Sequence, residues 1–170
     1  MSQTTVKEFR DRYVQGQIQN PSIADTEEGI VDDANPIYGG YTMIQGTNEK
    51  DRSLPVAAFT FAAFRGLAVW SGQAKEKNLY TGDNSYSDDD PITLLKRGII
   101  PVLLGETVVK GDTAFFVHTA GGASPIFTYR NDLDTNKASE IPAVFEQGGV
   151  SGDIVLLRVS IDAAIAKILT

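Results

Sequence analysis

The sequence of 170 residues contains no cysteine and only one histidine. Without cysteine there are no disulfides, thiolate metal sites or thiol nucleophiles. Because His118 is alone, a metal site with several histidines is excluded and a hydrolytic triad is not expected. His118 follows an apolar run, so we expect it to end a strand and bond locally. A role as a catalytic base is the alternative.

Positive charge is also in short supply. Lys and Arg number 15 against 22 Asp and Glu, giving a net charge of −7 and a pI near 4.6. An acidic surface repels phosphate backbones and anionic lipid, so we expect neither direct nucleic-acid binding nor membrane binding. No apolar run reaches transmembrane length, and residues 1–12 are too polar for a signal peptide. The sequence therefore predicts a protein that is made and used in the cytosol, unless lysis releases it.

Glycine and proline punctuate the whole sequence. The 16 Gly and 7 Pro residues separate short runs rich in Val, Ile, Phe and Tyr. This spacing favours a mainly β fold, either a compact β-barrel or a β-sandwich. The first residues differ, because a few apolar residues precede an amide-rich stretch. We therefore expect an extended N-terminal arm over 1–25 and a single β-rich domain over 26–170.

The pattern of apolar residues gives an expectation for each segment. The sequence "NEKDRSLP" at 48–55 reads as a charged loop, while 56–64 fits either a helix or a strand. Residues 141–149 are a further candidate strand. Asp162 is a suitable N-cap for a short closing helix over 162–170. We expect strands at 41–47, 65–72, 91–95, 99–104, 113–118, 126–129 and 152–161.

The triplet Lys110-Gly111-Asp112 lies between two apolar stretches and has three interpretations. It is an exposed receptor ligand, part of an anion-binding loop, or the bend of a hairpin. Glycine permits the positive φ of a tight turn, and aspartate bonds to the turn's backbone. Gly152-Asp153 also leads into an apolar strand, and Gly82-Asp83 occurs in a polar loop. This repetition favours the bend.

The acidic stretch Asp83–Asp90 invites a calcium interpretation, because oxygen ligands occur at alternate positions. It has Asp88 where an EF-hand needs glycine, and Leu94 where it needs glutamate. A solvated loop is therefore the preferred interpretation, with a metal site as the alternative. Gly121-Gly122 lacks the remainder of a phosphate-binding pattern. We expect no cofactor and no catalytic residue.

The segment "DPITLLKRGIIPVLLGETVVKGDTAFF" (Asp90–Phe116) resembles the structural cement, or head decoration, proteins of tailed bacteriophages. Members show an ordered series of strands, basic-Gly turns and Gly-Asp steps. Asp88-Asp89-Asp90 departs from this pattern where Gly-Asp is usual, and residues 124–143 have little that matches. The matching features are Asp90-Pro91, Lys96-Arg97-Gly98, Ile99–Leu104 and Gly111-Asp112, together with the pieces at Gln15–Ser22, Gly40–Thr47, Arg65–Gly72 and Gly152–Ile161.

The resemblance implies a non-enzymatic protein on the outside of an icosahedral head. Its expected partner is the major capsid protein, whose neighbouring subunits it would bridge and stabilise. Members commonly form symmetric oligomers, so a homo-oligomer is implied and a trimer is favoured. The implied location is the exterior of the virion.

The arm is the expected contact segment for the capsid or a neighbouring copy. Its apolar residues would supply anchors, and its amides would bond to backbone groups. The alternative is that Tyr13 and Ile18 only cover their own barrel. The predicted contact residues are Tyr13, Gln15, Gln17, Ile18, Asn20 and Pro21.

Two competing functions stay open at this point. One is a β-rich virion module that binds a host surface or a glycan, although the sequence shows no regular aromatic platform. The other is a small hydrolase or lyase that would depend on His118 and the acids of 83–90.

Overall fold

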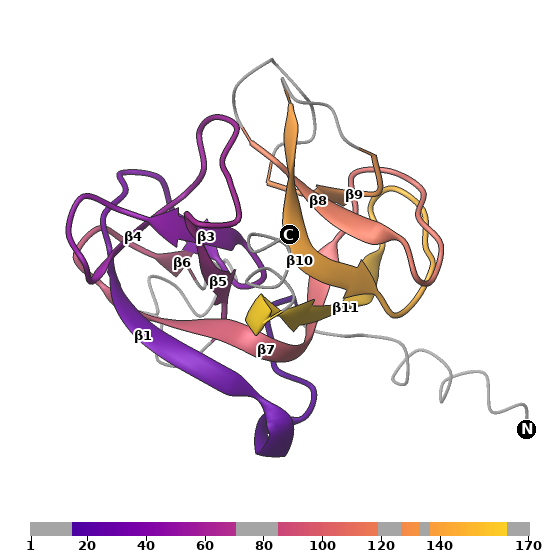
Figure 1. Ribbon diagram of the computed structural model, residues 1–170, viewed down its shortest axis with the longest axis horizontal. Coiled ribbons are helices and arrows are strands. Elements are labelled where there is room, and N and C mark those ends of the chain that lie inside the picture. Colours follow the sequence, from indigo (N-terminus) through magenta and orange to yellow (C-terminus); the bar gives the residue numbers. More distant parts are fainter. Residues whose placement is uncertain (1–14, 71–84, 119–126, 133–136, 163–170) are drawn as a thin grey trace, which may run out of the picture.

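The computed structural model describes residues 15–70, 85–118, 127–132 and 137–162. Strands make up most of the regular structure in these ranges, and they form two lobes that share one long strand (Figure 1). The elements are η1 (Pro21–Ile23), β1 (Asp25–Val31), β2 (Ile37–Tyr38), β3 (Thr42–Gln45), β4 (Asp51–Ser53), β5 (Phe64–Ala68), β6 (Ser85–Tyr86), β7 (Pro91–Leu103), β8 (Thr113–Val117), β9 (Tyr129–Arg130), β10 (Ala138–Phe145) and β11 (Ile154–Ser160).

The first lobe is a small closed barrel. Its strands run in the order β1-β4-β3-β5-β7, and an additional pairing between β1 and β7 closes the ring. Closure leaves no open edge in this ring, which removes a site for unwanted strand pairing. Its interior holds an apolar cluster that includes Val31, Met43, Leu54, Ile92 and Leu94. The predicted mainly β fold is therefore confirmed, and the barrel alternative is the one the structure adopts.

The second lobe continues from the same long strand. Here the order is β7-β11-β10-β8-β9, and a bridge between Leu104 and Tyr129 brings β9 back to the end of β7. The larger apolar cluster lies in this lobe and at its junction with the first, and it includes Ile100, Phe116 and Leu157. The predicted strands at 113–118 and 152–161 are confirmed as β8 and β11.

Strand β7 is one element of 13 residues, where we expected two strands separated by a turn at Lys96-Arg97-Gly98. Its register with β11 runs unbroken from Leu103 to Arg97, because Gly98 adopts a φ of 140° and bends the strand without ending it. Leu94 and Leu95 are both buried, since the strand passes there from the first core to the second.

A buried tyrosine joins the two lobes. Tyr129 on β9 is fully buried, and its hydroxyl donates to the carbonyl of Gly40 at 2.6 Å and lies 2.9 Å from the hydroxyl of Thr42. Burial raises the pKa of the Tyr129 hydroxyl, so it remains a donor at neutral pH. Phe116 and Tyr41 pack around it, with ring centres of Phe116 and Tyr129 5.1 Å apart.

Turns of the same construction precede three strands. In two of them, Asp112 accepts from the N–H of Val109 at 3.0 Å, and Asp153 accepts from that of Val150 at 2.9 Å. The residue before each aspartate is glycine, with φ of 92° at Gly111 and 91° at Gly152. The Lys-Gly-Asp triplet is therefore a tight turn, as the bend interpretation expected, but the flanking strands β7 and β8 do not pair with each other as a hairpin would.

The third such turn lacks glycine. Asp90 accepts from the N–H of Ser87 at 2.8 Å, and Asp89 takes the left-handed position with a φ of 64°. Aspartate tolerates this region better than most side chains. The sequence therefore has Asp89 where the other two turns have glycine, and the turn itself is the same.

Four strands were not expected. Residues 48–55, predicted as a charged loop, contain β4, and the acidic segment that ends at Val31 forms β1. The other two, β2 and β6, are two-residue strands that pair with each other. Residues 56–63 are bends and turns, so neither the helix nor the strand expected there forms, and Phe64 begins β5. Residues 141–149 contribute to β10, which begins earlier, at Ala138.

The described part of the predicted arm does not extend away from the domain. The N–H of Gly16 donates to Pro101 at 2.9 Å and that of Gln19 to Ile99 at 3.0 Å, so this segment lies along β7. β1 begins at Asp25, the last residue of the expected arm. Residues 1–14 and the expected helix from 163 onward lie outside the described residues. Among the helices that the structure describes, none is long and apolar enough to cross a membrane.

Candidate functional site

The predicted contact residues that the structure describes follow one another along the surface of β7. Gln17 is exposed, Gln15 is half-buried, and Tyr13 lies outside the described residues. Ile18 is half-buried against the core of the second lobe. The alternative given for Ile18, that it covers its own barrel, is therefore the arrangement found.

The segment then forms a short helical turn. Asn20 caps η1, because its side chain accepts from the N–H of Ser22 at 3.3 Å, and Pro21 occupies the first turn. The capping role anchors Asn20 within its own chain. Ile23, at the end of η1, is 61% exposed, the largest exposed fraction among the exposed large hydrophobic side chains of the described residues. We call residues 17–23 the ridge.

Ile23 was not among the contact residues predicted from the sequence. The signal was present, because an isoleucine directly after "QNPS" lies outside any alternating strand pattern. An apolar side chain held at the end of a capped turn is a suitable anchor for a partner. The fixed backbone on β7 also lowers the entropy that binding would cost.

A groove of about 830 Å³ begins beside the ridge. It opens where β10 and β11 diverge beyond the pair Ala143–Val159, and Figure 1 shows β10 rising away from β11. Much of its lining is apolar, but two arginines and two glutamates also border it. The lining residues are Ile23, Phe61, Arg97, Gly98, Ile99, Thr113, Glu140, Ile141, Pro142, Ala143, Val144, Glu146, Arg158, Val159 and Ser160.

The charged residues at the rim form ion pairs. Arg97 contacts Asp162 at 2.5 Å, and Arg158 contacts Glu146 at 2.7 Å. These pairs are solvent-exposed to varying degrees, so each contributes little to stability. Their effect is to balance the charge around the groove, which suits an apolar occupant with few charges.

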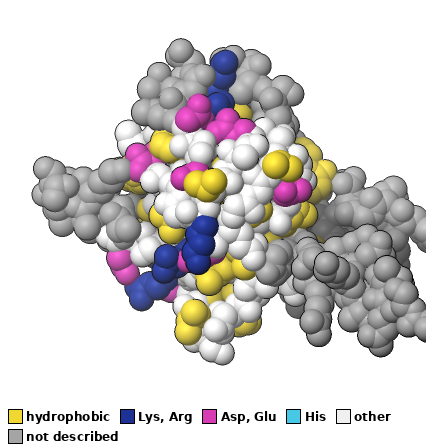
Figure 2. Space-filling model, turned by 90° about the vertical axis from the view of Figure 1, so that its right-hand side faces the viewer, with side chains coloured by type: hydrophobic (Ala, Val, Ile, Leu, Met, Phe, Trp, Pro, Cys, Tyr) yellow, Lys and Arg dark blue, Asp and Glu magenta, His cyan; other side chains and the backbone are white. Residues whose placement is uncertain are grey.

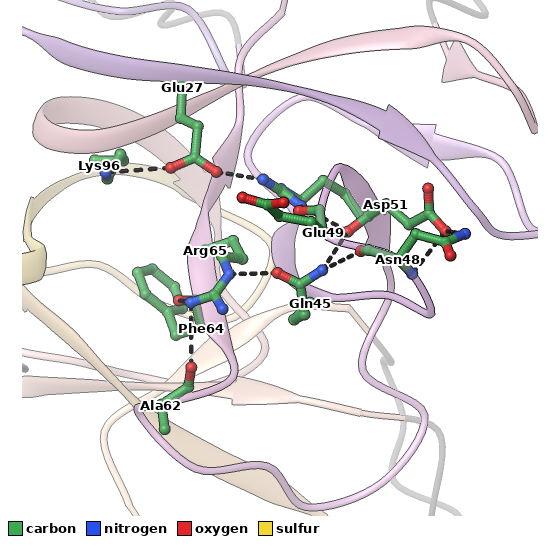
Figure 3. Close-up of polar contacts among 10 residues, drawn as sticks. Glu27, Gln45, Asn48, Glu49, Asp51, Ala62, Phe64, Arg65 and Lys96 are labelled. Carbon is green, nitrogen blue, oxygen red and sulfur yellow. Dashed lines mark hydrogen bonds and ion pairs between the residues drawn. The ribbon is translucent and has the colours of Figure 1, made fainter.

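A polar network supports the opposite side of the first barrel (Figure 3). Arg52 is buried on β4 and forms an ion pair with Glu27 of β1, and Lys96 of β7 reaches the same carboxylate at 3.2 Å. Burial would raise the pKa of Glu27, but the hydrogen bonds from Arg52 and Lys96 outweigh it and lower the pKa below its usual value.

The same network continues to β5. The side chain of Arg65 donates to Gln45 at 2.8 Å, and the amide of Gln45 in turn donates to the carbonyl of Asn48. The network therefore links all five strands of the first barrel (β1, β3, β4, β5 and β7) to the turn before β4, and its role is structural. It gives the barrel a rigid wall.

The other candidate residues that the structure describes lie in different surroundings. His118 is fully buried just after β8, and its backbone N–H donates to Lys137. Asp88 and Asp89 are exposed, while Asp83 lies outside the described residues. Within the described ranges, no group of three or more His, Asp or Glu side chains is placed to hold a metal ion.

The side of the molecule with the β7–β8 and β10–β11 connections has a mixed surface. Figure 2 shows its hydrophobic side chains at separate places, between acidic and basic ones. Val109 and Val150, in the two glycine turns, are 60% and 56% exposed. Their turns lie side by side, because Val108 and Gly149 exchange backbone hydrogen bonds. An exposed apolar area of this size, made by two valine side chains, is normal on a protein surface.

Comparison with known proteins explains this combination of a rigid scaffold and an exposed ridge. The family model described as "Structural cement protein (E217 gp24/Pam3 gp6)" matches residues 2–160. Comparison with curated proteins gives no match. A solved chain from "The capsid of Myoviridae Phage XM1" has a similar fold, with a TM-score of 0.65 and 14% identity over 88% of this chain and 91% of that one.

The family match spans nearly the whole sequence, including both lobes and the ridge. The protein is thus a component of a phage virion with a structural role in association with the capsid. It belongs to the structural cement protein family of bacteriophages, which its motifs of turns and strands had indicated.

Proposed function

We propose that this protein binds the exterior of an icosahedral phage head, bridges neighbouring major capsid protein subunits and so stabilises the shell. The observation that carries the proposal is the ridge, whose apolar residue Ile23 is 61% exposed on a backbone held against β7. Family membership and the similarity of fold to a chain from a phage capsid support the same role.

The physical reasoning is linkage. A protein that binds only the assembled, expanded shell stabilises that state by an amount set by its concentration relative to its dissociation constant. A homo-oligomer, with a trimer as the favoured form, would repeat a modest contact on adjacent subunits, so avidity would supply the affinity. The protein would be made in the host cytoplasm and added to the outside of the head.

The ridge is the proposed contact, with Gln17 and Ile23 among its exposed residues and Gln15 beside them. Asn20 and Pro21 shape the turn that presents Ile23. Tyr13 remains a proposed contact from outside the described residues. Deleting residues 1–21 is a poor test, because the deletion also removes Ile18 from the core of the second lobe.

Point variants give a sharper test. Gln17→Ala with Ile23→Ala truncates two exposed side chains of the ridge, and Val109→Ala is a matched control because Val109 is 60% exposed in a different turn. Purified proteins are added to heads that lack decoration, and bound copies are counted after sedimentation. We expect the ridge variant to lose at least tenfold in affinity and the control to bind normally. Equal binding of both variants, with both folded, would reject the ridge as the contact.

A further inference from the structure

Strand β7 bends at Gly98, where it passes from the first lobe to the second (Figure 1). On the N-terminal side of this residue β7 pairs with β1, and from Arg97 onward it pairs with β11. Gly98 has a φ of 140° and no side chain to oppose rotation of its backbone. The bend is therefore a position where the two lobes can change their relative orientation without breaking the shared strand.

Residues 15–24, which we call the strap, follow β7 across this bend. The N–H of Gln19 donates to the carbonyl of Ile99 at 3.0 Å, on the C-terminal side of Gly98. Ala24 lies over the bend itself, because a Cβ at Gly98 would be 3.5 Å from the Cα of Ala24. The next residue begins β1 and pairs with the N-terminal side of β7. The strap therefore contacts β7 on both sides of the bend.

Gly16 connects the other end of the strap to both lobes. Its N–H donates at 2.9 Å to the carbonyl of Pro101, in the half of β7 that pairs with β11. Its own carbonyl accepts from the N–H of Trp70 at 2.8 Å, and Trp70 lies just after β5 of the first barrel. Two backbone bonds of a single residue thus join the first barrel to the second-lobe half of β7.

A close crossing of two glycines allows the strap to lie in this position. A Cβ at Gly16 would be 2.4 Å from the Cα of Gly39, and a Cβ at Gly39 would be 2.9 Å from both the carbonyl oxygen of Gln15 and the Cβ of Trp70. Gly39 is not among the glycines with a positive φ, so alanine there would act through crowding alone. Because backbone atoms provide much of the crowding, alanine at Gly39 must push the strap away.

We propose that the strap fixes the angle between the two lobes, and that the crossing of Gly16 and Gly39 holds the strap in place. It acts across the bend at Gly98, in addition to the bond between the lobes made by Tyr129. The ridge is part of the strap, so a partner that binds the ridge also limits movement between the lobes. The inference concerns the isolated protein and does not depend on capsid binding.

The distance between two spin labels, one in each lobe, tests the proposal by pulsed electron paramagnetic resonance. The sequence has no cysteine, so Glu28→Cys on β1 and Ser151→Cys before β11 introduce the only labelling sites, and both residues are exposed. In this background, Gly39→Ala should at least double the width of the distance distribution. Gly46→Ala is the control and should leave the width unchanged. A Cβ at Gly46 is equally crowded, at 2.7 Å from the Cβ of Asp51, but it lies at the other end of β3.

Amide hydrogen exchange of the same variants shows whether the strap has detached. The N–H groups of Gly16 and Gln19 should exchange at least tenfold faster in Gly39→Ala than in the wild type. Ile18→Asp is a second variant, because it disrupts the contact of the strap with the core and leaves the crossing unchanged. Both measurements should change in the same way for this variant.

Two results would overturn the proposal. If Gly16 and Gln19 exchange faster in either variant while the label distances keep their wild-type width, the strap does not fix the angle between the lobes. If exchange at these two residues is unchanged in Gly39→Ala, the crossing does not hold the strap.

Discussion

The hydroxyl of Tyr129 donates to the carbonyl of Gly40 at 2.6 Å, and this bond crosses from the second lobe to the first. The two residues are 89 positions apart in the sequence. Both are buried, so the bond forms where water cannot replace either partner. The shared strand β7 and this contact together hold the two lobes in one orientation. A protein that bridges fixed positions requires such a fixed orientation.

Substituting Tyr129→Phe should destabilise the fold by about 1–3 kcal/mol, because the carbonyl of Gly40 and the hydroxyl of Thr42 lose a buried partner while the ring remains. Urea unfolding measures this directly. Tyr41→Phe is the control, since it removes the same atom from a half-buried ring at the same junction. If Tyr129→Phe lowers the free energy of unfolding no more than Tyr41→Phe does, the result would contradict the role given to this bond.

Asp89 and Gly111 occupy equivalent positions in their turns, and substitutions at the two should change the stability of the protein in opposite directions. Asp89→Gly should stabilise the protein by about 0.5 kcal/mol, because glycine takes a φ of 64° without the strain that a side chain brings. Gly111→Ala should destabilise it by about 1 kcal/mol for the same backbone reason. A Cβ at Gly111 meets nothing within 4 Å, so crowding does not contribute. Thermal unfolding of both variants checks the pair, and a stabilising Gly111→Ala would refute the argument.

The ion pairs of Glu27 predict how stability depends on pH. The pKa of Glu27 is lowered in the folded protein from its ordinary value of 4.5, because the bonds from Arg52 and Lys96 outweigh burial. The charged form is thus favoured by folding, and its contribution is present above that ordinary value. It is lost as pH falls through the lower, folded pKa.

The variant Glu27→Gln should therefore flatten the loss of stability as pH falls below about 5, because the wild type loses this contribution as Glu27 becomes protonated. Glu28→Gln, exposed on the same strand, is the control and should keep the steeper fall of the wild type. Urea midpoints measured across this range give the comparison. Parallel curves for Glu27→Gln and the wild type would show that this pair does not stabilise the fold.

Much of the fold could be predicted because apolar runs and turn residues mark it. β8 and β11 have β-branched and aromatic residues between Gly-Asp turns, and both were found in place. β1 and β4 could not be found this way. The sequence "DTEEGIV" has few apolar residues, and β4 buries Arg52 where an apolar residue is usual. Their pairing depends on β7 and on the Glu27 ion pair, which are distant in sequence.

The candidate site was predicted only in part. The amide-rich stretch from Gln15 to Pro21 lies at the surface, yet its backbone is bound to β7 and Ile18 faces the core. Sequence patterns cannot show which side of such a segment faces inward, because no regular period defines it. The groove depends on where β10 leaves β11. Pro142, directly before the first paired residue Ala143, is a local signal of this divergence because proline has no N–H for a ladder hydrogen bond, but it does not indicate that a groove forms there.

The central claim is that the ridge of this protein contacts the outside of a phage shell. A density map of heads decorated with the purified protein tests it most directly. The account predicts copies on the outer surface, with residues 17–23 against neighbouring capsid subunits. Both lobes should fit the density together as one rigid body. Copies seated with the ridge facing solvent, or density for the protein only at the tail, would contradict it.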